Sequence, residues 1–521
     1  MPLAAQSATS ATSATQKPNL VVVLVVDQMR PDYFTRWGAQ LTGGFARIHR
    51  DAAFFPAGMQ DHAMTETAPG HSTILSGREP VHTGIVSNGR GIQFPAFPSL
   101  EGGAKDGAAP YRFQGTTLAD WLMTADPDTR VLSVSRKSRA AILTVGRQKA
   151  NVFWYGVTGF TTSRWYADSL PTWLTAFNAR TKAAELARGE WRLLLPDSAY
   201  AERDSVLYEH GGTDIAFPHT WATSDKKASR LEALPVMDSL TLAVALDGAR
   251  HLRLGRGEST DLLVVALSTT DAVGHAYGHE SREMHDHILR LDRWVGAFLD
   301  SLNRVVPAAR TIVALTADHG MNTTPESRRA AGDSLAGRVA MKRVTASLDA
   351  EISRRTHVNA GLEFEGGLLY ADTVQLSSAG VNVDSVARAV AMQLESVAGI
   401  AHVYTARSLA AATDEDTDAR RWRHSIPPVT QWLVAVVAKP DYALSDGDGA
   451  EHGTMHEESV TVPIALMGAP FKAGVYPTRA RTVDIAPTLG SVLGLVLPTD
   501  LDGRVLEEAL VNRQPHTAMR N

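Results

Sequence analysis

Six side chains of this sequence could together hold metal ions, although they are spread over more than four hundred residues. They are Asp27, Asp271, His275, Asp318, His319 and His452. Carboxylate oxygens and imidazole nitrogens are ligands that zinc accepts. Two zinc ions about 4 Å apart can hold the attacking and leaving oxygens of an in-line displacement. The set therefore predicts a two-metal site that hydrolyses a phosphate ester.

Several of these residues also have an ordinary structural interpretation. Asp27 directly follows an apolar run and could be a helix N-cap, the common role of Asp at such a junction. Asp271 and His275 are spaced to lie one helical turn apart, on one side of a helix. That spacing occurs often by chance, so the pair alone is weak support for a metal site.

The remaining candidates differ in how strongly they support a metal site. Asp318 and His319 end an apolar run and are followed by Gly320, which suits close approach of the backbone to a metal. His452 lies in a polar, Gly-rich loop, where a surface histidine would be unremarkable. The joint occurrence of all six residues, most of them after apolar strand-like runs, is what favours a metal site.

Thr67 is the candidate nucleophile. It lies in Thr65–His71 (TETAPGH), where Pro69 and Gly70 predict a tight turn into a helix over Ser72–Leu75. A helix N-terminus at this point would favour a bound phosphate. Metal coordination would lower the pKa of the threonine hydroxyl enough for an alkoxide to attack phosphorus. The alternative is that this threonine is only a helix cap or a turn residue.

Three polar residues could hold the phosphoryl group, although each could also be an ordinary surface residue. They are Asn88, Lys137 and Arg139. The two cations follow the apolar run Val131–Ser135, which would bring both to the same sheet edge. If the segment is extended, alternation places them on one side. A guanidinium fork and an ammonium point charge suit a phosphoryl group with two negative charges.

The elements that must position these residues are strands and helices in alternation. Continuous apolar runs that suit buried parallel strands cover Asn19–Val26, Val131–Ser135, Leu262–Leu267, Ile312–Thr316, Leu433–Ala438 and Val462–Met467. Apolar residues that step by three and four predict a helix over Met284–Leu302, and Thr117–Met123 and Met237–Leu246 are also expected to be helical. In such α/β sheets, ligands bind beyond the carboxyl ends of the strands, where most of the candidate residues lie.

Two segments interrupt the alternation and predict insertions. Residues 145–235 are rich in Trp, Tyr, Gly and Pro, and we interpret them as a cap over the active-site edge. Residues 326–430 combine strand-like pieces with a helix near Val386–Leu394 and predict a small α+β insertion. The expected core then consists of residues 18–144, 236–325 and 431–521. The acidic run Asp414–Asp418 is expected to be a solvated loop.

Composition excludes several classes of protein. The sequence has no cysteine, which excludes disulfides, thiolate metal sites, a cysteine nucleophile and a cysteine-derived formylglycine. The net charge is −5 and no dense Lys/Arg stripe is present, so nucleic acid is not an expected partner. No apolar run approaches the roughly 20 residues that span a bilayer.

The first 17 residues, 1–17, are rich in Ala, Ser, Thr and Gln and predict a disordered leader. Leu3–Gln6 is similar to the end of a small-residue cleavage site. We therefore expect that a signal peptide has been removed and that the protein is periplasmic or secreted. The sequence leaves the oligomeric state open, a monomer included.

Together these motifs resemble the alkaline phosphatase superfamily, and most closely its bacterial periplasmic, phosphate-irrepressible monoesterases with a threonine nucleophile. The resemblance covers most of the core, which is similar to that of type I phosphodiesterases and nucleotide pyrophosphatases. It is carried by Asp27–Tyr33, Thr67–His71, Pro80–Ile85 with Asn88, Lys137-x-Arg139, Asp271-x3-His275, Ala317–Met321, His452–Gly453 and Val483–Leu489. It implies a mostly parallel sheet with helices on both faces and cap insertions.

The resemblance also implies a mechanism and a ligand set. One zinc ion would be bound by Asp27, Asp318, His319 and the Thr67 oxygen, and the other by Asp271, His275 and His452. The threonine would attack a small-molecule phosphate monoester and form a phosphothreonine intermediate. The resemblance further implies that Asn88, Lys137 and Arg139 hold the phosphoryl oxygens that are not transferred.

Other functions remain open at this point. Related nucleotide pyrophosphatases and phosphodiesterases resemble this chain at Thr67 and Asn88 but lack the Lys-x-Arg pair, and they hydrolyse diesters. A diester carries one negative charge fewer, so the pair Lys137 and Arg139 favours a monoesterase. A sulfatase is disfavoured because no activation motif is present, whereas a phosphomutase shares the fold. A catalytically silent metal- or phosphate-binding relative is the alternative from another class.

Overall fold

The computed structural model describes residues 17–101, 107–157, 159–181, 190–220, 231, 233–447 and 449–511. Residues 1–16, which form nearly all of the expected leader, lie outside the described residues. Among the described residues, no helix combines the length and the apolar character that crossing a bilayer requires.

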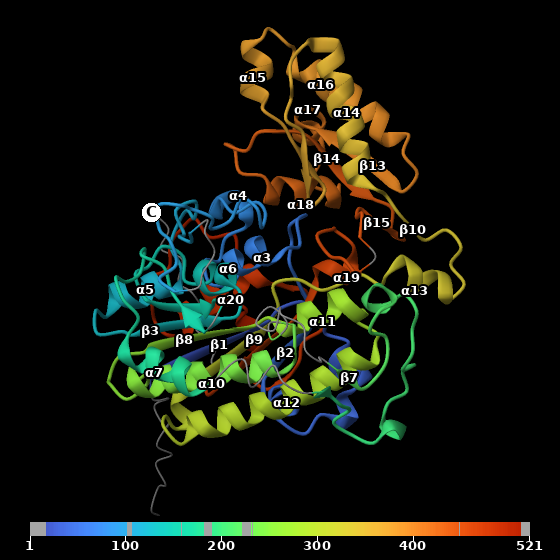
Figure 1. Cartoon of the computed structure of the whole chain (residues 1–521). Helices are drawn as coiled ribbons and strands as arrows, with labels where there is room; N and C mark the ends of the chain where they lie inside the picture. Colours follow the sequence, from blue (N-terminus) through green and yellow to red (C-terminus); the bar gives the residue numbers. More distant parts are fainter. Residues whose placement is uncertain are drawn as a thin grey trace, which may run out of the picture.

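A large sheet forms the centre of the molecule (Figure 1). Its strands, in spatial order, are β17 (Gly474–Val475), β2 (Ala53–Met59), β16 (Thr461–Met467), β9 (Thr311–Thr316), β1 (Leu20–Val26), β8 (Asp261–Leu267), β3 (Val131–Ser135), β4 (Asn151–Tyr155) and β5 (Phe160–Thr161), with β18 (Ala480–Arg481) also paired to β2. Strands β9, β1, β8, β3 and β4 are parallel. The expected mostly parallel α/β sheet is confirmed.

The apolar run of β1 is explained by burial on both faces of the sheet. All seven residues of this strand are buried. Leu20, Val22 and Leu24 pack into one hydrophobic cluster, whereas Val21 and Val23 pack into the other. A central strand of this kind has no polar face, so its sequence is continuous rather than alternating.

Helices cover both faces of the sheet. One face carries α2 (Gly44–Asp51), α7 (Thr172–Thr181), α10 (Val236–His251) and α12 (Arg282–Asn303), and the other carries α3 (Thr67–Ile74), α5 (Leu118–Ala125), α6 (Ser138–Leu143) and α20 (Ile485–Val492). The three helices expected from periodicity are present as α5, α10 and α12. Thr117 lies just before α5 and forms a capping box with Asp120.

Strand β16 runs against its neighbours, and this direction matters for the site. It is antiparallel to both β9 and β2. The residues that precede β16 therefore lie at the sheet edge where the parallel strands end. His452, which comes before β16 in the sequence, reaches the same edge as the residues that follow β1 and β9.

The segment 145–235 was expected to form a cap, but its described residues belong largely to the core. Strands β4 and β5 extend the main sheet, and α7 packs against α10. The short strands β6 (Glu190–Trp191) and β7 (His219–Thr220) pair with each other. Trp191 donates to Asp286 on α12. Most of the described aromatic residues of this segment pack in the hydrophobic cluster that also contains residues of α10 and α12, whereas Trp154 packs on the other face of the sheet.

The small insertion contains a second sheet, with the order β11 (Glu363–Glu365), β12 (Leu368–Tyr370), β14 (Trp432–Ala438) and β13 (Ile400–Thr405). It is flanked by α14 (Met341–Thr356), α15 (Thr373–Ser378), α16 (Val383–Glu395) and α18 (Thr417–Ser425). We call this unit the small domain. Its helix α16 contains the expected helix near Val386–Leu394.

Two expectations about this region need correction. Strand β14 was placed in the third part of the core, but it pairs with β12 and β13, and β15 (Tyr442–Ala443) pairs with β10 (Gly337–Arg338). The apolar run of β14 is explained by two hydrophobic clusters, one on each face of the small sheet. The acidic run is not only a loop, because Asp416 caps α18 and accepts a hydrogen bond from Tyr404.

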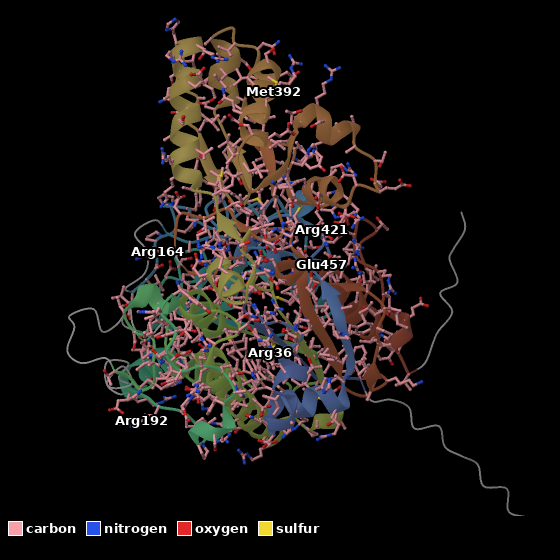
Figure 2. All side chains as sticks on the ribbon, turned by 90° about the vertical axis from the view of Figure 1, so that its right-hand side faces the viewer. Arg36, Arg164, Arg192, Met392, Arg421 and Glu457 are labelled. Carbon is pink, nitrogen blue, oxygen red and sulfur yellow. The ribbon has the colours of Figure 1, made fainter. Side chains whose placement is uncertain are left out.

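The small domain lies over the edge of the main sheet at which the candidate residues gather (Figure 1). Figure 2 shows Arg421 and Glu457 at the junction between the two units, with Met392 at the outer end of the small domain. Arg421 Nη2 and Glu457 Oε1 form an ion pair of 3.5 Å that joins α18 to the segment before β16.

Candidate functional site

The three candidate aspartates reach one edge of the sheet from three parallel strands. Asp27 directly follows β1, Asp318 lies just after β9, and Asp271 lies in α11 (Thr269–Tyr277), the helix that follows β8. The three strands are neighbours in the sheet, in the order β9, β1, β8. Asp27 is not a helix cap, because the next helix, α1 (Tyr33–Arg36), begins six residues later.

The six candidate ligands form two groups. In each group, one ligand atom per residue lies within 4.8 Å of the others. One group is Asp27, Asp318 and His319, and the other is Asp271, His275 and His452. The expected helical relation holds, since Asp271 and His275 lie on α11 with Oδ1 and Nε2 3.2 Å apart.

All three histidines are oriented in the same way. The Nδ1 atom of His275 donates to the carbonyl oxygen of Ala450. Likewise His452 Nδ1 donates to Thr65 O and His319 Nδ1 to Gly320 O. Because these carbonyl oxygens can only accept, each imidazole, when neutral, carries its lone pair on the Nε2 that points into its group. Despite burial, the Asp271 carboxylate raises the pKa of His275 to about 9, so a metal ion would displace a proton from this ring.

The donor set fits divalent cations. Asp27 Oδ1 and His319 Nε2 are buried, lie 3.5 Å apart and have no hydrogen-bond partner among the described residues. Burial lowers the pKa of His319 and of His452, which favours neutral imidazoles with a free lone pair. Burial and the Asp318 carboxylate raise the pKa of Asp27 to about 7. Buried unpartnered acceptors that face one another are what a bound cation would satisfy.

Thr67 lies between these groups and two cationic side chains. It is the first residue of α3, and its hydroxyl oxygen is 3.1 Å from Lys137 Nζ and 3.5 Å from Arg139 Nη2. Lys137 also contacts Asp27 Oδ2 at 2.5 Å and Asp271 Oδ2 at 2.6 Å. One ammonium group therefore touches the hydroxyl and both carboxylate groups.

The route by which the two cations reach Thr67 differs from the expected one. Helix α6 begins at Ser138, so residues 137–139 are not an extended segment with alternating side chains. Lys137 is the N-cap residue of α6, and Arg139 lies in its first turn. Helices α3 and α6 contact each other, and their first residues bring the hydroxyl and the two cations together.

Asn88 is held beside the start of α3. Its Oδ1 accepts from the backbone N–H of Ala68 at 2.9 Å, and its own backbone N–H donates to Glu66 Oε2 at 2.8 Å. Gly70 allows α3 to lie against the candidate ligands, because a Cβ at this position would be 2.2 Å from Asp318 O. The helix proposed over Ser72–Leu75 thus begins earlier, at Thr67 itself.

Sequence reasoning gave no role to two residues that touch the candidates. Gln28 donates to both Asp318 and Asp271, and the Glu66 carboxylate accepts from Asn88. Both are sequence neighbours of candidate residues, but nothing in residue type or spacing indicated that their side chains turn toward the site.

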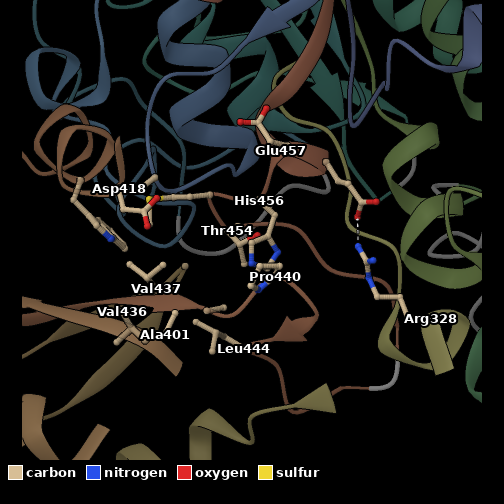
Figure 3. A pocket seen from close by; sticks show the side chains of 18 residues that line it. Arg328, Ala401, Asp418, Val436, Val437, Pro440, Leu444, Thr454, His456 and Glu457 are labelled. Atoms are coloured by element: carbon tan, nitrogen blue, oxygen red, sulfur yellow. Dashed lines mark hydrogen bonds and ion pairs between the residues drawn. The ribbon is translucent and has the colours of Figure 1, made fainter. Parts of the chain in front are cut away.

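Two cavities lie near the site. One of about 290 Å³ is lined by Glu66, Asn88, His275, His452 and backbone of the small domain at Gly366. The other, of about 450 Å³, lies between β14 and the segment before β16, where His456 and Glu457 face it (Figure 3). Of the ten predicted site residues, Asn88, His275 and His452 line the first cavity and none lines the second.

Comparisons with known proteins identify relatives that match nearly the whole chain. Alkaline phosphatase PhoK from a Sphingomonas species is 30% identical over 95% of this chain and 92% of its own length. Alkaline phosphatase PafA from Elizabethkingia meningoseptica is 28% identical over 96% of each chain. The crystal structure of wild-type PafA has a TM-score of 0.87 and covers 96% of this chain. A crystallised PafA variant, substituted at one threonine, one asparagine, one lysine and one arginine, has a TM-score of 0.89.

These relatives confirm the resemblance and the fold class predicted from the motifs. The model of the type I phosphodiesterase / nucleotide pyrophosphatase family matches residues 21–458, which include all ten predicted site residues. The chain therefore belongs to the type I phosphodiesterase / nucleotide pyrophosphatase family.

Proposed function

We propose that this protein is a metal-dependent phosphate monoester hydrolase, an alkaline phosphatase that uses Thr67 as its nucleophile. One observation carries the proposal: Lys137 and Arg139 both direct their cationic groups at the Thr67 hydroxyl, beside two groups of metal-ligand type. The names of the full-length relatives PhoK and PafA support the same activity.

The two ligand groups would each hold one divalent cation, for which we expect zinc. Asp27, Asp318, His319 and the Thr67 oxygen would bind one ion, and Asp271, His275 and His452 the other. Imidazole with carboxylate is a ligand combination that zinc accepts. Bound cations would lower the pKa of the Thr67 hydroxyl and offset negative charge on the phosphoryl group.

Thr67 would carry the phosphoryl group between two displacements. Its Oγ1 forms a bond to phosphorus while the bond to the ester oxygen breaks, and the leaving alcohol takes a proton. Water then attacks the phosphothreonine, releases inorganic phosphate and restores the hydroxyl. At the first turn of α3 the N–H of Ala68 donates to Asn88 Oδ1, that of Gly70 donates to Glu66 O, and Pro69 has no N–H. The cationic side chains rather than the helix terminus would therefore hold the transferred group.

The chain's own cations would select the monoester. A phosphate monoester presents two negative charges, and Lys137 and Arg139 supply two positive charges beside the attacking oxygen. Asn88, whose Oδ1 accepts from Ala68 and whose backbone N–H donates to Glu66, would donate its side-chain amide hydrogens to a phosphoryl oxygen. A diester has a single charge and an extra substituent, so this clamp would favour it less.

The PafA variant supports this assignment by its pattern of substitutions. Its threonine and asparagine are separated by the same number of residues as Thr67 and Asn88. Its lysine and arginine are separated by one residue, as Lys137 and Arg139 are. The four residue types proposed to act on the phosphoryl group therefore recur in the relative with the same spacing within each pair.

The test compares two substrates. Replacing Lys137 and Arg139 together by Ala should lower kcat/KM for p-nitrophenyl phosphate by about a hundredfold or more. The same variant should lose far less activity on bis-p-nitrophenyl phosphate. The control is Arg147→Ala, which removes an exposed cation beyond the other end of α6 and should leave both rates unchanged. Equal losses on both substrates would refute the monoesterase.

A diesterase is the second candidate, and the family description itself favours it. It predicts that wild-type protein hydrolyses the diester faster than the monoester. A catalytically silent relative predicts bound zinc with no turnover of any ester. A periplasmic or secreted location also stays a proposal, which fractionation of cells that express the full gene would test.

A further inference from the structure

Gln28 joins the two candidate ligand groups through two hydrogen bonds. Its backbone N–H donates to Asp318 Oδ1 at 3.1 Å, and its side-chain Nε2 donates to Asp271 Oδ1 at 2.9 Å. Asp318 belongs to one group and Asp271 to the other. We infer that Gln28 is a positioning residue, which fixes these two carboxylates relative to each other and so sets the metal affinity of the site. The inference rests on the proposed function.

The backbone of Gln28 has an unfavourable conformation that serves both contacts. Its φ is +68°, in the left-handed region that a residue with a Cβ adopts at a cost. A glycine would adopt this conformation without strain but would have no side chain to reach Asp271. Strain of this kind persists where the surrounding structure depends on it, and functional sites are where it gathers.

The environment of the Gln28 side-chain amide indicates that its role is to bind Asp271. Gln28 is fully buried, and its Oε1 has no hydrogen-bond partner among the described residues. A buried amide whose oxygen is unpartnered costs free energy compared with an apolar side chain of similar size. The hydrogen bond from Nε2 to Asp271 offsets this cost.

Gly274 provides the space for this side chain. It lies on α11 between Asp271 and His275, and a Cβ at its position would be only 1.7 Å from Gln28 Oε1. Any other residue at position 274 would push the amide away from Asp271. The helix that carries two ligands of the second group is thus shaped to admit Gln28.

The carboxylate of Asp271 is held at both of its oxygens. Asp271 Oδ2 is held by Lys137, whereas Oδ1 is held by Gln28 and faces the Nε2 atoms of His275 and His452. Both oxygens of the carboxylate are therefore fixed. Partners that orient a ligand from behind raise metal affinity, and their loss typically weakens it by about 10- to 100-fold.

The experiment measures metal binding rather than turnover. Gln28→Met keeps the volume of the side chain and removes the donor, and zinc affinity is read by competition with a chromophoric chelator. We expect the dissociation constant of the more weakly bound zinc ion to rise by about 10- to 100-fold. The control is Asn178→Leu, which removes an amide with two hydrogen bonds to Phe160, far from the ligands, and should leave zinc affinity unchanged.

A double-mutant cycle separates positioning from a general loss of stability. Gly274→Ala alone should weaken zinc binding as Gln28→Met does, because its Cβ displaces the amide. In the double variant Gln28→Ala/Gly274→Ala the clash with the amide is absent and, of the closest contacts, only that with Met321 Sδ at 2.9 Å remains, so Gly274→Ala should add little to the effect of Gln28→Ala. Wild-type zinc affinity in Gln28→Met overturns the inference. A wild-type protein that binds no zinc would instead refute the proposed function.

Discussion

The Nε2 atoms of His275 and His452 lie 3.1 Å apart, although each ring donates its Nδ1–H to a backbone carbonyl oxygen. Two imidazoles held in this way turn lone pairs toward each other and toward Asp271 Oδ1, which is within 3.4 Å of both. Converging lone pairs repel unless a positive charge lies among them, either a proton on His275, whose pKa the Asp271 carboxylate raises to about 9 despite burial, or a metal ion that displaces this proton. The arrangement is therefore preorganised for a metal ion.

Removal of divalent metal should abolish activity and lower stability together. Dialysis against a chelator should reduce p-nitrophenyl phosphate hydrolysis to background, and added zinc should restore it. Cations that bind only the folded state stabilise it by about 3 to 4 kcal/mol when they are in 100- to 1,000-fold excess over the dissociation constant. Thermal unfolding with and without zinc measures this. An unchanged melting temperature after verified metal removal would contradict the site.

Gly70→Ala should disturb the close contact between α3 and the segment that carries Asp318. The added Cβ would lie 2.2 Å from Asp318 O, so α3 or the segment that carries Asp318 must move. Overpacking of this kind costs about 1 to 3 kcal/mol. Displacement of the nucleophile should lower kcat by about a hundredfold. Gly38→Ala is the matched control, because nothing lies within 4 Å of its Cβ, and it should leave kcat unchanged. Full activity of Gly70→Ala would show that this close approach does not matter.

Glu209→Gln should stabilise the protein at alkaline pH. Burial, with the Glu283 and Asp204 carboxylates nearby, raises the pKa of Glu209 from 4.5 to about 9. The folded state therefore keeps a proton that the unfolded state loses above pH 4.5, and stability falls as pH rises from about 5 to 9. The glutamine removes this loss, so the free energy of unfolding should rise by about 1 to 2 kcal/mol at pH 9.

The same substitution should have little effect near pH 4, where both states are protonated. Denaturant unfolding of wild type and variant across this pH range measures the difference. Glu415→Gln, at an exposed position, should show no such trend. A benefit from Glu209→Gln that is equal at pH 4 and pH 9 would mean that the carboxylate does not titrate as described.

Much of the site could be predicted because its residues follow strands with a strong sequence signature. The runs before Asp27 and Asp318 are buried on both faces, and the carboxyl ends of parallel strands meet at one edge. The pair Asp271 and His275 follows from helical spacing. His452 is different, because it precedes a strand, and only the antiparallel direction of β16 brings it to the same edge.

Other features were beyond the sequence because tertiary partners determine them. The run Leu433–Ala438 resembles a central strand of the main sheet, but the small domain buries one of its faces and a cluster that includes Met64 and Val86 of the core buries the other. The early start of α6 at Ser138 depends on its contact with α3 and on the adjacent strands. The role of Gln28 depends on a positive φ and on space at Gly274, neither of which residue type alone reveals.

The most direct test is to ask whether phosphorus becomes attached to Thr67 during turnover. Zinc-loaded protein is mixed with a phosphate monoester, quenched in acid within one turnover and digested for mass spectrometry. The phosphoryl group should be found on the peptide that contains Thr67, and Thr67→Ala should carry none and lose hydrolysis. Rapid hydrolysis by Thr67→Ala, or a wild-type enzyme that turns over with no phosphorylated Thr67, would contradict the mechanism.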